Sequence, residues 1–176
     1  MKTSSKLMVA FFALLALAAD QLSKALVINY VKPGETIPII PNFLNLTLTF
    51  NRGAAFGLLA DAPDGTRQLM IGALTALALL VVGWLLIKDY RDHLSAQFAL
   101  ALVIGGAVGN VIDRVRLGHV IDFIDAYYGY RHWPAFNLAD SAICVGVALL
   151  FLVSLFTKPA ELPRPPRVRD KAARPF

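Results

Sequence analysis

The sequence predicts an all-α membrane protein with four transmembrane helices and a small β-sheet and loop region on the non-cytoplasmic side. Hydrophobic residues form 57% of the 176 residues and charged residues only 16%, and the mean hydropathy is +0.59. This composition departs from that of soluble proteins. Four apolar segments approach the roughly 20 residues that a helix needs to cross a bilayer. Short alternating patterns between them are typical of strands.

Three of the four spans follow directly from the composition. Residues 69–87 are uncharged and begin just after a polar turn, and residues 96–112 are also uncharged. Residues 138–156 carry a single charge, Asp140, near their start. We therefore expect a transmembrane helix over each of these ranges.

The first apolar segment, residues 7–28, allows two interpretations. Lys2 and Lys6, followed by a short apolar run and small residues, also describe a cleavable secretory signal. Apolar residues continue beyond the small residues, however, and Asp20 and Lys24 stand four apart, on one face of a helix. Because a paired, inward-facing charge lowers the cost of spanning, we favour a retained transmembrane helix.

The distribution of Lys and Arg orients the chain, since short cytoplasmic loops are enriched in these residues. With the N-terminus inside, Lys88 and Arg91 also lie inside, together with the basic C-terminal segment. We expect both termini to be cytoplasmic and residues 29–68 and 113–137 to lie outside. Most of the unusual polar residues fall in these two outer segments, so function is sought there.

The excess of positive charge does not indicate nucleic-acid binding. Of the 17 Lys and Arg residues, which outnumber 12 Asp and Glu, many lie in a proline-rich tail and do not cluster on a folded, aromatic surface. Residues 158–176 contain too few apolar residues to pack. We expect a membrane domain over residues 1–157, a disordered basic cytoplasmic tail over 158–176, and membrane lipids as neighbours.

Two patterns in the outer segments predict a small sheet. Residues 44–50 alternate apolar and polar side chains with a period of two, and they run into a glycine-containing turn that begins at Asn51. Residues 119–124 are short and rich in β-formers, and aromatic residues such as Tyr127 and Trp133 follow them. A sheet at the membrane interface, with an aromatic belt, is the expected setting.

Small residues in the apolar segments predict helix packing. Gly105 and Gly109 form a small-xxx-small pair, which we expect to serve contacts between helices of this chain. The single cysteine, Cys144, excludes an intrachain disulfide and a cysteine-based metal site. We expect Cys144 to be a small buried residue. Its spacing from Asn137 and Asp140 predicts that all three share one helix face.

Asp122 and Asp140 are the residues that most need an explanation. An acidic group costs about 2.5 to 3.5 kcal/mol at the centre of a membrane helix and less near its end, so retained acids usually mark function. Helix capping is an alternative role for Asp140, but it leaves unexplained why Asp122 lies among apolar residues. Two carboxyl groups brought close share a proton, so one acts as base toward water and the other as acid. The pair predicts aspartic peptidase chemistry.

The sequence contains fewer of the residues that other catalytic mechanisms require. It contains no His-Glu-x-x-His zinc motif, no phosphate-binding glycine loop followed by lysine, and no Gly-x-Ser-x-Gly. A metal site of His119, Asp122 and Asp125 is disfavoured because two of these residues lie on opposite strand faces. A serine–lysine catalytic pair of Ser23 and Lys24 is also disfavoured, because adjacent residues on a helix point about 100° apart. A transporter or channel and a non-catalytic scaffold remain as rival classes.

Five short blocks of sequence follow one another along residues 7–156. They are Asp20-Gln-x-Ser-Lys24, Asn51-Arg-Gly-Ala-Ala-Phe56, Gly105-Gly-Ala-x-Gly-Asn110 through Asp113-Arg114, Gly118-His-Val-x-Asp-Phe123 and Phe136-Asn-x-Ala-Asp-Ser141. With these blocks in this order the chain resembles bacterial lipoprotein signal peptidase, also called signal peptidase II. Five spaced blocks are more specific than one short motif.

The resemblance implies an aspartic endopeptidase of the bacterial cytoplasmic (inner) membrane. Such an enzyme removes the signal peptide of a prolipoprotein by cutting before a diacylglyceryl-modified cysteine on the periplasmic or outer side, without a cofactor or metal. It also implies an outer β cradle with a short interfacial helix, and we expect a monomer. The family's catalytic aspartates match Asp122 and Asp140, whereas Asp125 lies outside the matched block. The positions that match its substrate-binding or supporting residues are Asp20, Lys24, Asn51, Gly53, Asn110, Arg114 and Asn137.

Overall fold

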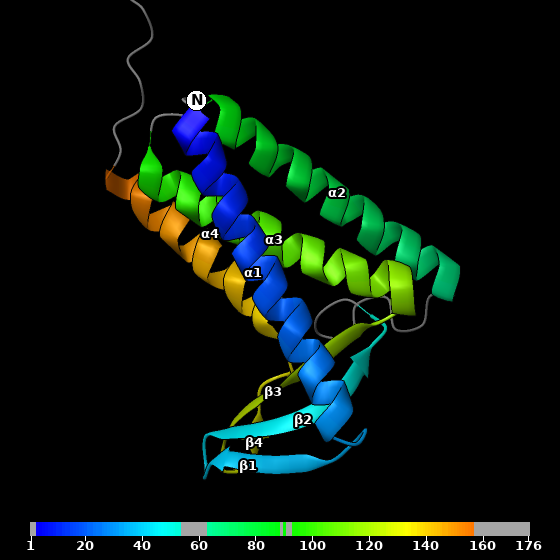
Figure 1. Ribbon diagram of the computed structural model, residues 1–176. Helices are drawn as coiled ribbons and strands as arrows, with labels where there is room; N and C mark the ends of the chain where they lie inside the picture. Colours follow the sequence, from blue (N-terminus) through cyan, green and yellow to red (C-terminus); the bar gives the residue numbers. More distant parts are fainter. Residues whose placement is uncertain (1–2, 54–62, 89, 91–92, 157–176) are drawn as a thin grey trace, which may run out of the picture.

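The computed structural model describes residues 3–53, 63–88, 90 and 93–156. Within these residues a group of long helices stands on a small antiparallel sheet (Figure 1). The helices are α1 (Thr3–Tyr30), α2 (Asp64–Lys88), α3 (Leu94–Leu117) and α4 (Leu138–Phe156). The strands are β1 (Thr36–Ile40), β2 (Leu44–Asn51), β3 (Val120–Tyr128) and β4 (Arg131–His132).

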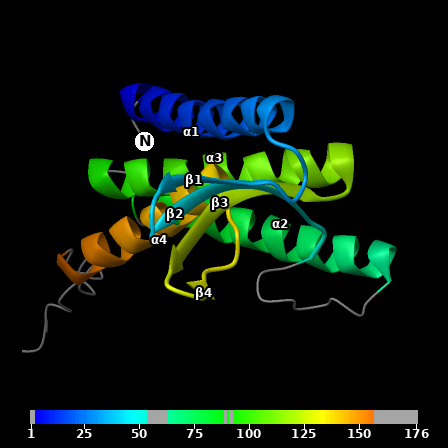
Figure 2. The same cartoon turned by 90° about the horizontal axis from the view of Figure 1, so that it is seen from below.

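Helix α3 lies at the centre of the bundle and packs against each of the other three helices. Two views show α1 and α2 on different sides of α3, with α4 along a third side (Figures 1 and 2). Glycines allow the close approach: a side chain at Gly105 would strike the backbone oxygen of Ala13, and one at Gly106 would strike that of Ala139. A Cβ at Gly109 would lie 2.6 Å from Asp20 Oδ2. The packing role predicted for Gly105 and Gly109 is confirmed.

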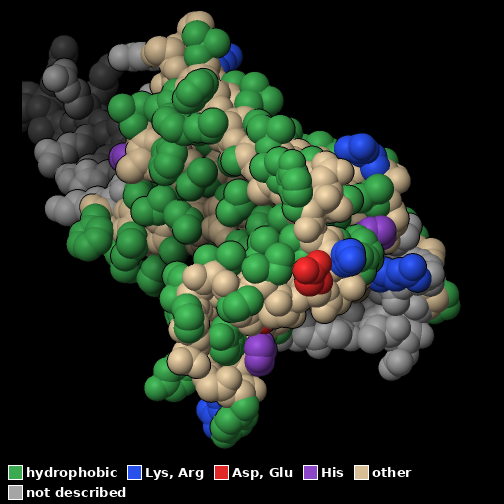
Figure 3. Space-filling model, turned by 60° about the horizontal axis from the view of Figure 1, so that its bottom comes forward, with side chains coloured by type: hydrophobic (Ala, Val, Ile, Leu, Met, Phe, Trp, Pro, Cys, Tyr) green, Lys and Arg blue, Asp and Glu red, His purple; other side chains and the backbone are tan. Residues whose placement is uncertain are grey.

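Three helices, α1, α3 and α4, are long and apolar enough to cross a membrane. The apolar part of α2, Leu69–Leu85, is shorter, so its place as the fourth span stays a prediction. Hydrophobic side chains cover much of the visible face of the molecule (Figure 3). Large apolar residues such as Leu74 and Leu80 of α2 are 69% and 71% exposed, as expected for side chains that contact lipid.

Helices α1, α2 and α3 are longer than the ranges predicted for their spans, whereas α4 has the predicted bounds. At about 1.5 Å per residue, a helix as long as α1 exceeds the roughly 30 Å hydrocarbon core. Helix α3 continues to Leu117, so the first residues of the predicted outer segment 113–137 are helical. Gly118 ends it in the left-handed region, with φ of 74°, and its N–H donates to the Arg114 carbonyl oxygen.

The sheet has the order β1-β2-β3-β4, with antiparallel neighbours. The strand predicted over 44–50 is β2, and the β-rich segment 119–124 is the first part of the longer β3. The short strands β1 and β4 carry no pattern that the sequence analysis identified. The end of α1 packs on the sheet through a cluster of Val27, Val31, Leu48, Ile121 and Phe123.

Two local predictions, the burial of Cys144 and the helix face that it shares with Asn137, are wrong. Cys144 is exposed, not buried, because it faces away from α3 while Gly146 of the same helix packs against Ala99. Asn137 precedes α4 and is fully buried, so it does not share a helix face with Cys144. The tail predicted over 158–176 lies outside the described residues. The resemblance implied a short interfacial helix but gave no residue range for it.

The first helix is part of the packed core. Asp20 and Lys24 of α1 are 0% and 1% exposed, and they face α3, as predicted for a paired inward face. This packing supports the interpretation that residues 7–28 form a retained helix.

Candidate active site

Asn137 brings the two predicted catalytic acids together. Asp122 is the third residue of β3, and Asp140 lies in the first turn of α4. The side-chain Nδ2 of Asn137 donates to Asp122 Oδ1 at 2.8 Å, and the backbone N–H of Asn137 donates to Asp140 Oδ2 at 3.3 Å. One residue between β3 and α4 therefore contacts both carboxyl groups.

Asn137 and Asp140 also cap the N-terminus of α4. The Oδ1 of Asn137 accepts a hydrogen bond from the backbone N–H of Asp140 at 2.9 Å, while the Asp140 carboxyl accepts from the Asn137 N–H. This reciprocal arrangement is that of a capping box. The alternative role considered for Asp140 is thus present as well, and it fixes the carboxyl in place.

Two further asparagines complete the set of amide donors. Asn51 Nδ2 donates to Asp122 Oδ2 at 2.9 Å, and Asn110 Nδ2 donates to Asp140 Oδ1 at 2.8 Å. The backbone N–H of Gly53 donates to Asn51 Oδ1 at 3.0 Å, which turns the Nδ2 group of Asn51 toward Asp122. Each carboxyl group therefore accepts two hydrogen bonds.

A buried ion cluster lies beside the two acids. Lys24 Nζ is 2.8 Å from Asp20 Oδ2 and 2.7 Å from Asp113 Oδ2, and it donates to Asn110 Oδ1 at 3.1 Å. These partners match the three donors of an ammonium group. Asp20 Oδ1 also accepts from the backbone N–H of Ala139 at 2.9 Å. The cluster therefore ties α1 to both α3 and α4.

Asp113 and Gln21 have a part in the site that was not predicted from the sequence. Gln21 Nε2 donates to Asp113 Oδ1 at 2.9 Å, and Asp113 Oδ2 accepts from the Ile121 N–H at 3.3 Å. Asp113 thereby holds the start of β3, next to Asp122. Both residues stood within the matched blocks, and their helical spacing from Lys24 and Asn110 was the available signal.

Burial raises the pKa of Asp122 to about 6. Its side chain is 2% exposed, so the charged form loses most of its hydration. The charge of Asp140 acts in the same direction, whereas hydrogen bonds from Asn51 and Asn137 and the charge of Lys24 partly oppose the rise. A carboxyl group that holds its proton close to neutral pH suits acid–base catalysis.

Arg114 is the remaining predicted residue, and it lies near the acids. Its Nη1 donates to the Asn110 carbonyl oxygen at 3.4 Å, and its charge attracts Asp140 most strongly, then Asp122 and Asp113. The structure thus brings together every site residue that the sequence predicted, with Gly53 acting through Asn51.

Asp125, which lies outside the matched block, belongs to a separate network. Its carboxyl accepts from Asn45 Nδ2 at 2.8 Å and lies 2.8 Å from His132 Nδ1. Burial acts to raise the pKa of Asp125, but these hydrogen bonds and the His132 charge hold it below the usual value. Among the described residues, Asp125 forms its side-chain hydrogen bonds with Asn45 and His132 and none with the residues around Asp122.

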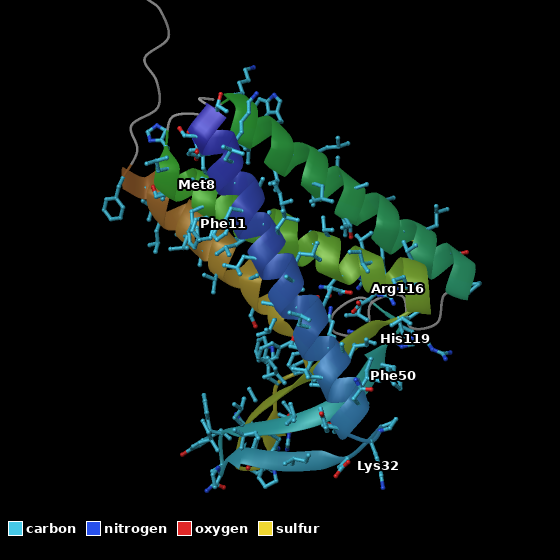
Figure 4. All side chains as sticks on the ribbon, viewed as in Figure 1. Met8, Phe11, Lys32, Phe50, Arg116 and His119 are labelled. Carbon is cyan, nitrogen blue, oxygen red and sulfur yellow. The ribbon has the colours of Figure 1, made fainter. Side chains whose placement is uncertain are left out.

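The other chemistries weighed from the sequence are not assembled here. The ring of His119 lies 4.7 Å from that of Phe50, and both lie where the sheet meets the end of α3 (Figure 4). Across the described ranges, no group of three or more His, Cys, Asp or Glu side chains could hold a metal ion. Ser23 Oγ donates to the Asp20 carbonyl oxygen at 2.8 Å, while Lys24 pairs with Asp20 as predicted.

Comparison with known proteins agrees with this architecture. Residues 12–156 match the family model described as signal peptidase (SPase) II. A lipoprotein signal peptidase of Syntrophotalea carbinolica is 44% identical over 153 residues, covering 86% of this chain and 93% of that protein. The lipoprotein signal peptidase of Desulforapulum autotrophicum is 40% identical and covers 92% of this chain and 100% of its own length.

Solved structures show the same fold. A bacterial membrane enzyme determined by the in meso method at 2.3 Å superposes with a TM-score of 0.75 at 35% identity, covering 85% of this chain and 88% of that one. A second, determined at 1.9 Å, gives a TM-score of 0.73 at 36% identity, covering 86% and 94%.

Proposed function

Because the chain belongs to the signal peptidase II family, whose members remove signal peptides from prolipoproteins, we propose that it is an aspartic endopeptidase with Asp122 and Asp140 as its catalytic pair. Its substrate is a diacylglyceryl-modified prolipoprotein, cut just before the lipid-bearing cysteine. The observation that carries the proposal is the pair of hydrogen bonds from Asn137, which hold one carboxyl from β3 and one from α4 beside each other.

The geometry supports hydrolysis by an activated water. Two neighbouring carboxyl groups that share one proton supply a base, which removes a proton from water, and an acid, which protonates the peptide carbonyl oxygen. The asparagine amides fix the carboxyl groups, so little reorganisation is needed as charge develops. Asn51 and Asn137 act on Asp122, and Asn110 and Asn137 act on Asp140.

The proposed orientation places the active site at the outer surface of the bacterial inner membrane. Helices α1 and α3 begin, and α2 and α4 end, at the end of the bundle opposite the sheet (Figure 1). With this end cytoplasmic, both termini and Lys88 lie inside, in agreement with the positive-inside rule. A lipidated substrate would then reach the pair from the outer leaflet, and the enzyme would act as a monomer without a cofactor.

The decisive experiment is a gel-shift assay of purified protein in detergent with a diacylglyceryl-modified precursor, beside an unlipidated copy. We expect the lipidated precursor to be cut and the unlipidated one to be spared. Asp122→Asn and Asp140→Asn should each lower cleavage by at least about a hundredfold, the scale of a lost acid or base. A transporter or a scaffold would leave the precursor intact with the unaltered chain.

The matched control is Asp125→Asn. Asp125 lies on the same strand as Asp122, three residues further on, but it bonds to Asn45 and His132 instead. We expect this variant to retain most of the activity. Full inactivation by Asp125→Asn, or normal cleavage by Asp122→Asn, would contradict the proposed pair.

A further inference from the structure

The two acids occupy unlike surroundings although each accepts two hydrogen bonds. Asp122 is 2% exposed and projects from a strand, and both of its donors, Asn51 and Asn137, are neutral side-chain amides. Asp140 is only partly buried. Because desolvation disfavours the charged form of a carboxyl group, burial alone places the proton of the pair on Asp122.

The position of Asp140 in α4 favours its charged form. It lies in the first turn of the helix, where it accepts the backbone N–H of Asn137. The N-terminal end of a helix carries a partial positive charge and unsatisfied N–H groups, and both stabilise a carboxylate there. Asp122 projects from a β-strand, which has only a small net dipole.

A cation acts on Asp140 through one intervening amide. Lys24 Nζ donates to Asn110 Oδ1 at 3.1 Å, and Asn110 Nδ2 donates to Asp140 Oδ1 at 2.8 Å. An ammonium group on the oxygen side of an amide strengthens its N–H donors, since linked hydrogen bonds polarise one another. Lys24 also attracts Asp122. The path between them differs, because Lys24 and Asn137 both donate to Asn110 Oδ1 and Lys24 does not bind the oxygen of the Asn137 amide that donates to Asp122.

The other charged side chains around the pair do not neutralise the two catalytic carboxyl groups. Asp20 and Lys24 face it from α1, and Asp113 and Arg114 face it from α3. Formally, the two cations offset Asp20 and Asp113, so no positive charge of this cluster is left over for the two catalytic acids. Two close carboxyl groups without such compensation hold one proton between them.

We propose that the roles are fixed: Asp122 carries the shared proton, and Asp140 is the carboxylate that activates water. The inference rests on the proposed function. As the water oxygen bonds to the peptide carbon, one water proton passes to Asp140, the carbonyl π bond opens, and the Asp122 proton passes to the carbonyl oxygen. In the second step Asp140 gives its proton to the leaving nitrogen and Asp122 takes one from a hydroxyl, as the C–N bond breaks. The pair ends as it began.

The test follows the proton by ¹³C NMR of the aspartate carboxyl groups in the detergent-solubilised full chain. We expect the unaltered protein to show a carboxyl signal that titrates at unusually high pH. The signal should be missing from Asp122→Asn and present in Asp140→Asn, where it moves to lower pH because a like charge is gone. Persistence in Asp122→Asn, loss in Asp140→Asn, or no such signal in the unaltered protein would overturn the assignment.

A second variant tests the path from Lys24 without altering either acid. Asn110→Ala removes the polarised amide, so part of the proton should move to Asp140 and a second high-pH carboxyl signal should appear. A merely structural role for Asn110 would lower activity and leave one signal; that result would overturn this part of the inference. The cleavage assay on the same samples separates the two proposals, because a precursor that stays uncut refutes the proposed function whichever acid holds the proton.

Discussion

At the scale of single residues, asparagine side chains position the two catalytic carboxyl groups. An amide offers a donor and an acceptor in one plane, so Asn110 and Asn137 each join neighbouring groups without adding charge. Asn137 serves three elements: it donates to Asp122 on β3, accepts from the N–H of Asp140 on α4 and donates to Asn110 on α3.

Stability should depend on pH through Asp122. The folded chain keeps its proton up to about pH 6, whereas an unfolded chain releases it near the ordinary value of about 3.9. Raising the pH through this window therefore destabilises the folded protein, by up to about 3 kcal/mol. Asp122→Asn removes this pH dependence. As the pH rises from about 4 to about 7, the thermal midpoint of the variant should therefore increase by several degrees relative to that of the unaltered chain.

Asp125→Asn supplies the control for this melting experiment in detergent. The pKa of Asp125 is below the usual value in the folded chain, so its contribution is present above about pH 4 and is lost only in stronger acid. Asp125→Asn should therefore not reproduce the gain expected for Asp122→Asn over the same window, because it removes a carboxylate that the folded state stabilises. A difference between Asp122→Asn and the unaltered chain that does not change with pH would contradict the raised pKa.

The site residues could be proposed from the sequence because they stand in ordered blocks, but their partners could not. Nothing in the order of residues shows that Asp113 accepts the Ile121 N–H or that Asp125 pairs with His132. Such contacts depend on how a helix end meets a strand, which side-chain spacing does not specify.

At the scale of elements, glycine sets the distance between helices. Gly105 lies against Ala13 of α1, and Gly146 of α4 lies against α3, where an added Cβ would be 2.6 Å from the Ala99 oxygen. Backbones this close place Asp20 and Lys24 within reach of Asn110 and Asp113. Helix positions were predictable from the long apolar runs. The ends of α1, α2 and α3 were not, since polar residues of a spanning helix continue beyond the bilayer core.

Gly105→Ala should destabilise the bundle. The new Cβ would overlap the backbone oxygen of Ala13, which cannot move as a side-chain end can, and overpacking of this kind costs about 1 to 3 kcal/mol. Gly72→Ala in α2 is the matched control, because nothing lies within 4 Å of its added Cβ. Alanine there should be neutral or stabilising by up to about 1 kcal/mol. Equal midpoints for the two variants in thermal melts would contradict the packing.

At the scale of the whole molecule, the sheet projects beside the N-terminal end of α4 (Figure 1). Large exposed side chains collect at its tip: Phe43 is 58% exposed, Tyr128 83%, Tyr130 88% and Trp133 61%. The β1–β2 turn and the β3–β4 hairpin form one tip, since the Tyr127 N–H donates to the Phe43 carbonyl oxygen at 2.9 Å. Aromatic residues of this kind are enriched at membrane interfaces.

We expect Trp133 to lie among the lipid headgroups. The chain has two tryptophans, so Trp84→Phe leaves Trp133 as the single reporter. In vesicles its fluorescence should be quenched more by lipids brominated near the headgroup than by lipids brominated near the chain ends. Trp133→Phe, which reports Trp84 on α2, serves as the comparison and tests whether that helix is in the bilayer. No quenching of Trp133 by either lipid would show that the tip stands in water.

The order in which the site residues are synthesised has a consequence for biogenesis. Asp122, Asn137 and Asp140 all come from the last third of the chain, and Asn137 contacts Asn110 of the helix made before it. A nascent chain that ends with α3 contains the residues of the ion cluster but neither acid. Hydrolytic competence should therefore arise only when α4 docks, which keeps a half-translated protease from acting on its neighbours.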